Sequence, residues 1–408
     1  RFCCLNILID IRKREPDASD SLRCSPKTST AFPKYIIQGN GQKCKPEVIQ
    51  YMEIREVCDW SGENDVISLT PEYSKREVRN AGRILAEGDA DAAEYARSVE
   101  IADNWRAAHA VPLQTFYMHF KNKYGQYLVA QRLKRLSSIA AKLERFPTMS
   151  LDRMQDLGGC RVITNASHEV SRVVDDYKHS RVRHELHKEY DYISHPKPDG
   201  YRSYHMVYRY RSDRESRRAY QDMLIEIQVR SHLQHIWATA VEMMGAITRE
   251  SLKSGNGGAE VRRFFALISS MFAIREDTPV VPDTPSDSKE IALEIQALES
   301  RFGFLKQLTA GCVITKHMDS EKDFQMGFVV LRRAGNILVI HAFRPSQLLQ
   351  AVQCYNALEA ENPSTDAVLV RTKDLLSLRR AYPNYFMDIA EFVAIVRDAL
   401  NGQGVNIA

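Results

Sequence analysis

The chain has 408 residues, enough for two domains of ordinary size, and 44% of them are hydrophobic while 26% are charged. This balance is typical of a soluble globular protein, and no run of about 18 apolar residues predicts a transmembrane helix. The formal net charge of +4 is too small to indicate a nucleic-acid-binding protein by itself. The eight cysteines have neither CxxC spacing nor zinc-finger spacing, so we expect free thiols in a reducing cytoplasm.

Residues 1–51 differ in composition from the rest of the chain. They hold half of the cysteines, and Ser, Thr, Pro and Lys fill 20–34 without periodicity. The apolar stretch 2–11 is too short for a signal peptide and has the wrong flanks. We expect a poorly structured extension, or the product of a misplaced start. A cysteine-based metal site in this segment is the less favoured alternative.

Apolar residues at three- and four-residue steps predict helices between 71 and 120, and the segment 133–145 predicts a helix with a basic face. At about 100° per residue, four residues share that face: Lys134, Ser138, Lys142 and Arg145. A solvated charged surface is the usual explanation of such a basic helix face. However, no acidic residue balances this face before Glu144, which favours an anion as ligand. Arg132 stands at the start of this predicted helix.

Two acidic residues accompany two predicted strands. Asp156 precedes a pair of glycines and a β-branched run. In the segment 224–230 apolar and polar residues alternate, so that Glu226, Gln228 and Arg230 share one face. A carboxylate in the middle of a strand needs a metal ion or an arginine beside it. Two carboxylates on neighbouring strands, surrounded by Arg and Lys, favour Mg²⁺-dependent phosphate chemistry.

A Pro-Asp-Gly sequence at 198–200 predicts a tight turn, followed by a strand. Tyr201, beside Arg202 and His205, is placed to stack a flat base while the cations hold its phosphates. An ordinary hairpin with an aromatic cap explains this stretch equally well. Lys197, just before the turn, is well placed for an acceptor phosphate.

Seven basic residues crowd the segment 178–188. A solvated charge run is the favoured explanation. The alternative is a contact surface for a phosphate-rich acceptor. Further on, three prolines and several small residues make 278–288 a predicted linker and domain boundary. The residues after it predict a long helix over 289–308, a hairpin near 327–341 and further helices and one strand, without a convergent set of acids, cysteines or histidines.

Four blocks of sequence, taken together, resemble the synthetase domain of the RelA/SpoT alarmone synthetase family. They are Asp-x-x-Gly-x-Arg from Asp156, Gly-Tyr-Arg-Ser-x-His from Gly200, Glu-Ile-Gln-Val-Arg from Glu226, and the basic block from Arg132 to Lys142. They occur in the family's order and at its approximate spacing across about residues 100–245. We find no His-Asp pair of the hydrolase type, so the resemblance is to the small monofunctional members, some of which are toxins.

The resemblance implies an α/β fold with a nucleotidyltransferase-like mixed β-sheet flanked by helices, and the pattern of the last residues adds a small C-terminal α/β domain. Together with the composition, this divides the chain into an extension (1–51), the synthetase domain (52–277), the linker (278–288) and a regulatory or interaction domain (289–408). The implied reaction moves the β,γ-pyrophosphate of ATP to the 3′-hydroxyl of GDP or GTP. His235 resembles the family's histidine in the helix after the acidic strand, although a packing role explains it as well.

The same resemblance implies a role for each site residue. Asp156 would bind Mg²⁺, and Glu226 would share the metal or take the proton of the attacking hydroxyl. Arg161 would neutralise charge on the transferred group. The ATP site would be Arg132, Lys134, Ser138 and Lys142. The acceptor site would be Lys197, Tyr201, Arg202, His205, Gln228 and Arg230, with the ring of Tyr201 stacked on the base.

Two alternatives remain open at this point. The acceptor could be the 3′ end of tRNA, as in toxin-like members that stop translation, and the basic segment 178–188 favours this mildly. An inactive nucleotide-sensing domain is the other alternative, against which the intact Asp156, Tyr201 and Glu226 argue. We also expect a cytoplasmic protein without membrane association, with a regulatory protein partner for the C-terminal residues and a homo-oligomer both open.

Overall fold

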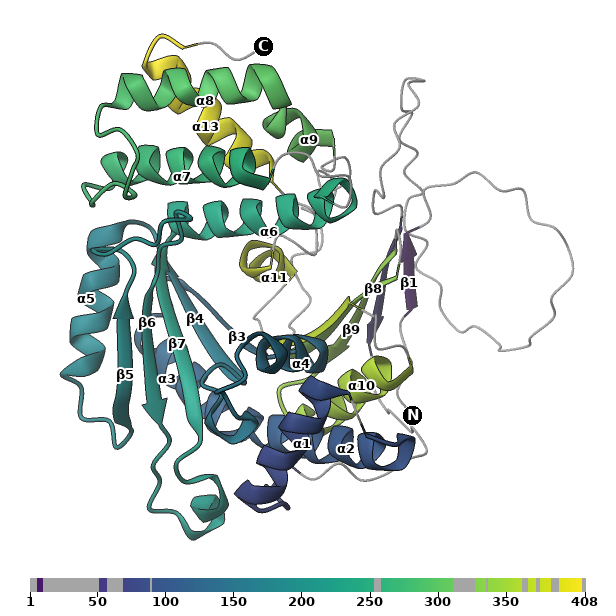
Figure 1. The fold of residues 1–408 in the computed structure, drawn as a ribbon. Coiled ribbons are helices and arrows are strands. Elements are labelled where there is room, and N and C mark those ends of the chain that lie inside the picture. Colours follow the sequence, from purple (N-terminus) through teal and green to yellow (C-terminus); the bar gives the residue numbers. More distant parts are fainter. Residues whose placement is uncertain are drawn as a thin grey trace, which may run out of the picture.

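The computed structural model describes residues 6–9, 51–56, 69–88, 90–252, 258–310, 327–334, 337–361, 366–371, 375–382 and 389–405. A ten-stranded mixed sheet runs through this part of the chain in the order β1-β2-β9-β8-β10-β3-β4-β7-β6-β5 (Figure 1). Its strands are β1 (Asn6–Ile9), β2 (Tyr51–Glu56), β3 (Leu128–Leu133), β4 (Gly158–Thr164), β5 (Glu185–Asp191), β6 (Tyr204–Arg209), β7 (Leu224–Ser231), β8 (Phe328–Ala334), β9 (Ile337–Phe343) and β10 (Asp366–Arg371).

Helices flank the sheet, which confirms the predicted fold class of a mixed sheet flanked by helices. They are α1 (Lys75–Glu87), α2 (Ala92–Ala108), α3 (Ala110–Lys123), α4 (Leu136–Arg145), α5 (Ser167–Lys178), α6 (His232–Leu252), α7 (Gly258–Arg275), α8 (Ser288–Phe302), α9 (Phe304–Ala310), α10 (Leu348–Glu361), α11 (Leu375–Ala381) and α13 (Ala390–Gly402), with 3-10 turns η1 (Leu151–Arg153) and η2 (Glu215–Tyr220). Within these residues no helix is both long enough and apolar enough to cross a membrane.

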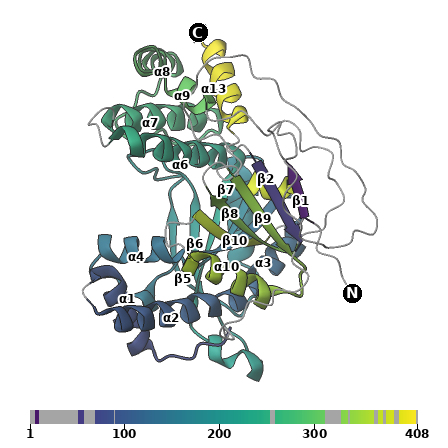
Figure 2. The ribbon, with the colours of Figure 1, turned by 90° about the vertical axis from the view of Figure 1, so that its right-hand side faces the viewer.

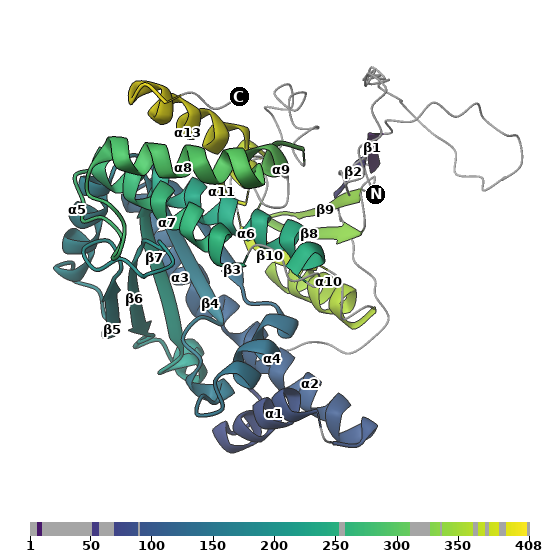
Figure 3. The same ribbon diagram turned by 45° about the horizontal axis from the view of Figure 1, so that its top comes forward.

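Two hydrophobic cores hold these elements together. The first lies between α3, α5 and one face of β3, β4, β7 and β6, where strand alternation turns Val162, Ile227 and Val229 toward the helices. The second joins α6, α7, α8, α9 and α13, and Phe264 and Phe392 are among its buried rings. Figures 1 and 3 show α6, α7, α8 and α13 stacked at one end of the molecule and α1, α2 and α4 at the other.

The residues after the predicted linker share the sheet and both cores with the residues before it. Strand β10 pairs with β3 in antiparallel fashion, Val370 opposite Arg132 and Arg371 opposite Gln131, so β8, β9 and β10 extend the same sheet (Figure 2). Phe328 belongs to the first core and Phe392 to the second. The predicted boundary at 278–288 therefore coincides with no break in the sheet, because the edge of β3 offers β10 a partner for its backbone groups.

The predicted basic helix over 133–145 is shorter in the structure. Leu128–Leu133 form strand β3, and the helix α4 begins only at Leu136, so Arg132 lies on a strand and Lys134 in the connection. Pairing with both β4 and β10 decides this, because the strand's backbone groups are satisfied on both sides. The predicted long helix 289–308 is also divided, since Gly303 adopts φ 65° and ends α8.

Most of the predicted extension 1–51, including its cysteines, lies outside the described residues. Within it, Asn6–Ile9 form β1, which pairs with β2, and β2 continues the sheet beside β9. In the part of the chain that the structure describes, the side chains of Cys160 and Cys354 are buried.

Candidate active site

One face of the sheet collects the predicted polar residues. The register places Glu226 opposite Gly159, and Gln228 opposite both Arg161 and His205. Because residues paired across neighbouring strands point to the same side, six side chains share this face: Arg132, Arg161, His205, Glu226, Gln228 and Arg230. The opposite face is the one buried against α3 and α5. Strand alternation therefore separates a polar face from the core.

The carboxylate of Glu226 is held from two sides. Its Oε1 lies 2.9 Å from Nδ1 of His205, and its Oε2 accepts a hydrogen bond of 2.7 Å from Nε2 of Gln228. Burial opposes ionisation of Glu226, but the hydrogen bond and charge of His205 outweigh it, so its pKa lies below its usual value. Nε2 of His205 in turn lies 2.9 Å from the hydroxyl of Tyr201. Glu226 is thus ionised and fixed in direction.

Asp156 precedes β4 and meets two lysines. Nζ of Lys134 donates to one carboxylate oxygen at 2.9 Å, and Nζ of Lys142 lies 3.0 Å from the other. Burial opposes ionisation here too, and the two ammonium groups outweigh it, so the pKa of Asp156 lies below its usual value. Asp156 and Glu226 also interact. The negative charge of Asp156 raises the pKa of Glu226, although the net shift of Glu226 is downward. The predicted acids therefore belong to one electrostatic site.

Two arginines of this face, the half-buried Arg161 and the buried Arg230, have no ion pair with a carboxylate among the described residues. Arg230 donates from NH2 to Nδ1 of His235 at 2.6 Å, and Nε2 of His235 lies 2.8 Å from the carbonyl of Arg380. Burial lowers the pKa of Arg230 to about 9, and the charge of Arg161 adds to this. An anion would relieve both effects, since it would neutralise two guanidinium groups at once.

The C-terminal residues also reach Arg161. Its NH1 donates to the carbonyl of Ala381 at 3.4 Å, and its guanidinium lies 6.0 Å from the ring centre of Tyr382. The hydroxyl of Tyr382 donates to the carbonyl of Gln131 on β3 at 2.9 Å. Burial and then the charge of Arg230 hold the pKa of His235 well below its usual value, so His235 is neutral and accepts from Arg230.

A group of aromatic side chains lies beside Glu226. Nζ of Lys197 stands 4.2 Å from the ring centre of Tyr192 and 5.0 Å from that of Tyr201. Tyr190 stacks on Tyr192 with ring centres 5.7 Å apart and planes 4° apart. No role of Tyr190 or Tyr192 is predicted from the sequence. Their signal is the Tyr-x-Tyr spacing, which puts both rings on one side of a strand end.

The structure does not bring Arg202 to this group. Its guanidinium is buried and donates to Oγ of Ser269 at 2.9 Å, to the carbonyl of Ile193 at 3.2 Å and to that of Pro279 at 2.6 Å. Burial lowers its pKa to about 10. Arg202 therefore fastens the turn to α7 and the segment after it. The turn itself needs Gly200, whose φ is 91° and where a Cβ would come 2.8 Å from Trp237.

The other predicted ATP residues lie nearby on β3 and α4. Ser138 is half-buried, one turn before Lys142, and Arg132 stands opposite Gly159 in the sheet. The basic segment 178–188 lies at the edge of the sheet on and before β5. Lys178 pairs with Glu189 at 2.7 Å and Arg183 with Asp213. Arg181 and Lys188 are exposed.

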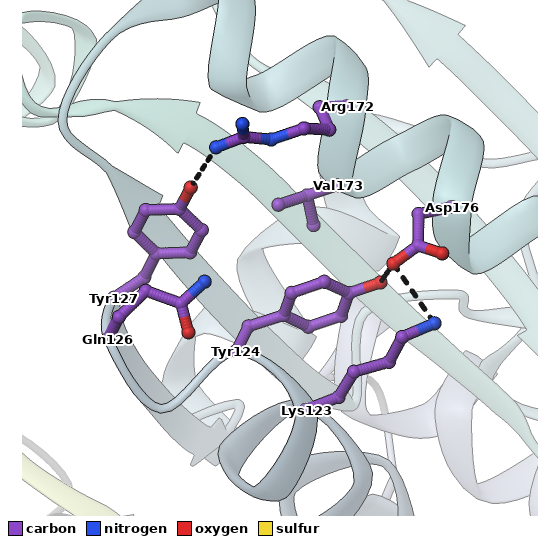
Figure 4. A pocket seen from close by; sticks show the side chains of 7 residues that line it. All are labelled: Lys123, Tyr124, Gln126, Tyr127, Arg172, Val173 and Asp176. Atoms are coloured by element: carbon purple, nitrogen blue, oxygen red, sulfur yellow. Dashed lines mark hydrogen bonds and ion pairs between the residues drawn. The ribbon is translucent and has the colours of Figure 1, made fainter.

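A hollow of about 250 Å³ opens on the side of α3 and α5, and it contains none of the predicted site residues (Figure 4). The hydroxyl of Tyr124 donates to Asp176 at 2.6 Å, and the hydroxyl of Tyr127 accepts from Arg172 at 2.8 Å. These four polar side chains are thus paired with one another.

Comparison with known proteins locates the similarity in the same residues. Residues 131–244 match the family described as "Region found in RelA / SpoT proteins". The chain is 30% identical over 129 residues to GTP pyrophosphokinase YjbM of Bacillus subtilis, covering 31% of this chain and 60% of that protein. It is 27% identical over 181 residues to the uncharacterized protein Rv1366 of Mycobacterium tuberculosis, covering 43% and 59%. The chain thus spans about 60% of the length of these relatives.

Among solved structures, the chain is similar to small alarmone synthetase 1 of Bacillus subtilis bound to its product pppGpp. The identity is 25%, the match covers 42% of this chain and 92% of that one, and the TM-score is 0.34. The matched family region runs from β3 to α6 and includes Asp156, Tyr201 and Glu226. Residues 131–244 of this chain therefore form a RelA/SpoT-type region, as the four sequence blocks predict.

Proposed function

We propose that this protein transfers the β,γ-pyrophosphate of ATP to the 3′-hydroxyl of GDP or GTP. The observation that carries the proposal is that two ionised carboxylates, Asp156 and Glu226, lie in one site with Arg161 and Arg230, which form no ion pair with a carboxylate among the described residues. Carboxylates suit a metal ion and a proton acceptor, and unneutralised arginines suit phosphate groups. The similarity to a GTP pyrophosphokinase supports the same reaction class.

In this proposal ATP lies over α4 and β3. Lys134 and Lys142, which now share Asp156, turn to the phosphates of ATP, and Ser138 and Arg132 complete the site. Asp156 and Glu226 fit Mg²⁺, since this ion is commonly held by one or two carboxylates together with substrate phosphates. When bound, Mg²⁺ would neutralise charge on the phosphate oxygens.

The acceptor lies on the aromatic side of the site. Tyr201 stacks its base, and Lys197, which stands over Tyr192 and Tyr201, meets its phosphates. The carboxylate of Glu226, oriented by His205 and Gln228, takes the proton of the 3′-hydroxyl. The 3′-oxygen then forms a bond to the β-phosphorus while the bond from that phosphorus to the α,β-bridging oxygen breaks, and AMP leaves with the electron pair. Arg161 and Arg230 stabilise the charge on the transferred group.

A second acceptor, the 3′ end of tRNA, is favoured by one specific observation. The stacked pair Tyr190 and Tyr192 continues from the site into β5, the edge strand that also bears exposed Lys188. Stacked aromatic rings followed by cations suit an unpaired polynucleotide end. The guanine nucleotide remains the favoured acceptor, because the similar protein YjbM is a GTP pyrophosphokinase.

The deciding experiment incubates the protein with ATP labelled in its γ-phosphate and with GDP, GTP or tRNA in parallel, and separates the products. Labelled guanosine tetra- or pentaphosphate supports the first proposal, and labelled tRNA without either nucleotide supports the second. Nucleotide binding without any labelled product would mean a nucleotide-sensing domain. A cytoplasmic location, a regulatory protein partner and a homo-oligomer stay predictions.

A further inference from the structure

Helix α4, which carries Ser138 and Lys142, begins without a cap from its own segment. Arg135 stands at its N-cap and makes no side-chain cap hydrogen bond. The amide of Leu136, the first residue of the helix, instead donates to Oε1 of Glu359 at 3.3 Å. Glu359 lies on α10, 223 residues further along the chain. A carboxylate at this position satisfies a free backbone N–H and meets the positive end of the helix dipole.

Glu359 is itself fixed by a buried arginine of α2. Arg106 has no exposed surface, and it forms an ion pair with Glu359 and another with Asp103 at 2.8 Å. NH2 of Arg106 also donates to Oδ1 of Asn356 at 2.8 Å, and its guanidinium lies 4.7 Å from the ring centre of Tyr355. Burial works against the charge of Arg106, but Asp103 and Glu359 outweigh it and raise its pKa.

These contacts leave α4 with two kinds of anchor. Ile139 and Leu143 hold its apolar side in the core, and Glu359 holds its first turn. A helix of ten residues is not stable by itself in water, so its position depends on such tertiary contacts. The two hydrophobic anchors fix the side that faces the core. The hydrogen bond to Glu359 fixes the start of the helix along its axis.

We propose that Glu359 is a positioning residue for the ATP site. It sets the first turn of α4, and through it the place of Ser138 and of Lys142, whose ammonium lies 3.0 Å from Asp156. Glu359 does not touch substrate in this proposal, which rests on the proposed role of Lys142 in ATP binding. The C-terminal residues thereby contribute to the nucleotide site of the RelA/SpoT-type region.

The test compares Glu359→Ala, Glu359→Gln and Asn356→Ala in the full chain. Asn356→Ala is the matched control, because Asn356 contacts the same buried Arg106 but makes no hydrogen bond to α4. Binding of α,β-methylene-ATP is measured by titration calorimetry, and amide hydrogen exchange of 136–145 by mass spectrometry. Loss of one hydrogen bond to a charged group predicts a roughly 5–20-fold higher Kd for Glu359→Ala, with faster exchange in the first turn of α4.

Glu359→Gln, which keeps an acceptor for Leu136, is expected to restore most of the affinity, and Asn356→Ala to change the Kd less than about twofold. Equal effects of Glu359→Ala and Asn356→Ala on Kd and on α4 exchange would reduce Glu359 to a general stabilising role and overturn the inference. The variant Lys142→Ala distinguishes a failure of the proposed ATP site from a failure of the positioning role of Glu359. If it leaves the Kd unchanged, the proposed ATP site fails and the inference with it. If it abolishes binding while Glu359→Ala does not weaken it, only the inference fails.

Discussion

Nδ1 of His205 lies 2.9 Å from Oε1 of Glu226, and the other nitrogen of the same ring lies 2.9 Å from the hydroxyl of Tyr201. The carboxylate accepts from Nδ1–H, and Nε2 of the same ring meets the hydroxyl of Tyr201. The proposed proton acceptor and the proposed base-stacking residue are therefore joined through one imidazole. A substitution of Tyr201 or His205 is therefore expected to affect the carboxylate of Glu226.

Catalysis is expected to need both acids. Asp156→Asn and Glu226→Gln keep the size of each side chain and remove the charge that a metal ion or a proton requires. Product formation from ATP and GDP should fall by more than about 100-fold in each, a typical loss for a positioned acid or base. Circular dichroism should show an unchanged fold. Glu189→Gln, on the exposed edge strand, serves as the control. Turnover near the wild-type rate in either acid variant would contradict the assignment.

Tyr201→Ala is expected to raise the KM of the acceptor much more than that of ATP, because stacking on a base contributes ~1–3 kcal/mol. Tyr201→Phe keeps the ring and loses only the hydrogen bond to His205. It should retain acceptor affinity and lower kcat. The two KM values are measured with the other substrate saturating. An equal rise in both for Tyr201→Ala would mean that the ring supports the turn rather than the acceptor.

The basic edge distinguishes the two acceptors. The triple variant Arg181→Ala, Arg183→Ala and Lys188→Ala removes cations on and beside β5 that contact backbone phosphates if the acceptor is tRNA. Labelling of tRNA should then drop strongly and lose its steep salt dependence, since each contact releases counterions. If the acceptor is GDP or GTP, the rate should change little.

The control for this variant removes three exposed cations from α7 and α8, namely Arg262, Lys289 and Arg301. It should affect neither acceptor. A guanine-nucleotide product formed at the wild-type rate by the β5 variant would rule out tRNA as the main acceptor. Labelled tRNA without any guanine-nucleotide product would rule out the alarmone reaction.

The free energy of unfolding is expected to fall as the pH is lowered, already above the pH at which carboxylates become protonated. Burial lowers the pKa of His109 to about 4, below the value near 6.5 of an unfolded histidine. The unfolded chain therefore binds a proton first, and stability present above about pH 6.5 is lost as the pH falls toward 4. For His109 alone the loss between pH 7 and pH 5 is about 2 kcal/mol.

Denaturant unfolding of His109→Gln at these two pH values checks this expectation. The variant keeps a donor for the carbonyl of Trp105, which Nδ1 of His109 meets at 2.7 Å. Its free energy of unfolding should change less between pH 7 and pH 5 than that of the wild type. His168→Gln, at an exposed position, should behave like the wild type. The same slope in all three proteins would contradict a neutral, buried His109.

Gly200→Ala is expected to disturb the acceptor side of the site. A Cβ there would lie 2.8 Å from Trp237 and 3.0 Å from Cβ of Ser269, and the φ of 91° is unfavourable for alanine. Such backbone strain costs about 1–3 kcal/mol. The thermal midpoint should fall and the KM of the acceptor should rise, with the KM of ATP little changed. Gly245→Ala, where a Cβ would meet nothing within 4 Å, is the control. An unchanged acceptor KM would mean that the turn does not position Tyr201.

The sequence by itself determined that Glu226, Gln228 and Arg230 share one face of a strand. These three residues alternate within β7, and the Pro-Asp-Gly turn precedes the neighbouring strand β6, so that residues close in sequence encode both features. The motif spacing likewise identified Asp156. These features depend on local backbone periods and turn conformations, which a short stretch of chain specifies on its own.

Only the tertiary structure decided where long side chains and strand edges find their partners. Lys134 lies outside the helix that the sequence predicts, because β3 pairs on both sides, and its ammonium group still contacts Asp156. Arg202, predicted to bind the acceptor, instead donates to the carbonyls of Ile193 and Pro279. Glu359 accepts a hydrogen bond from the first residue of α4, which lies 223 residues earlier in the chain. Each outcome satisfies a buried polar group with a partner distant in sequence, and no local pattern specifies which distant partner that is.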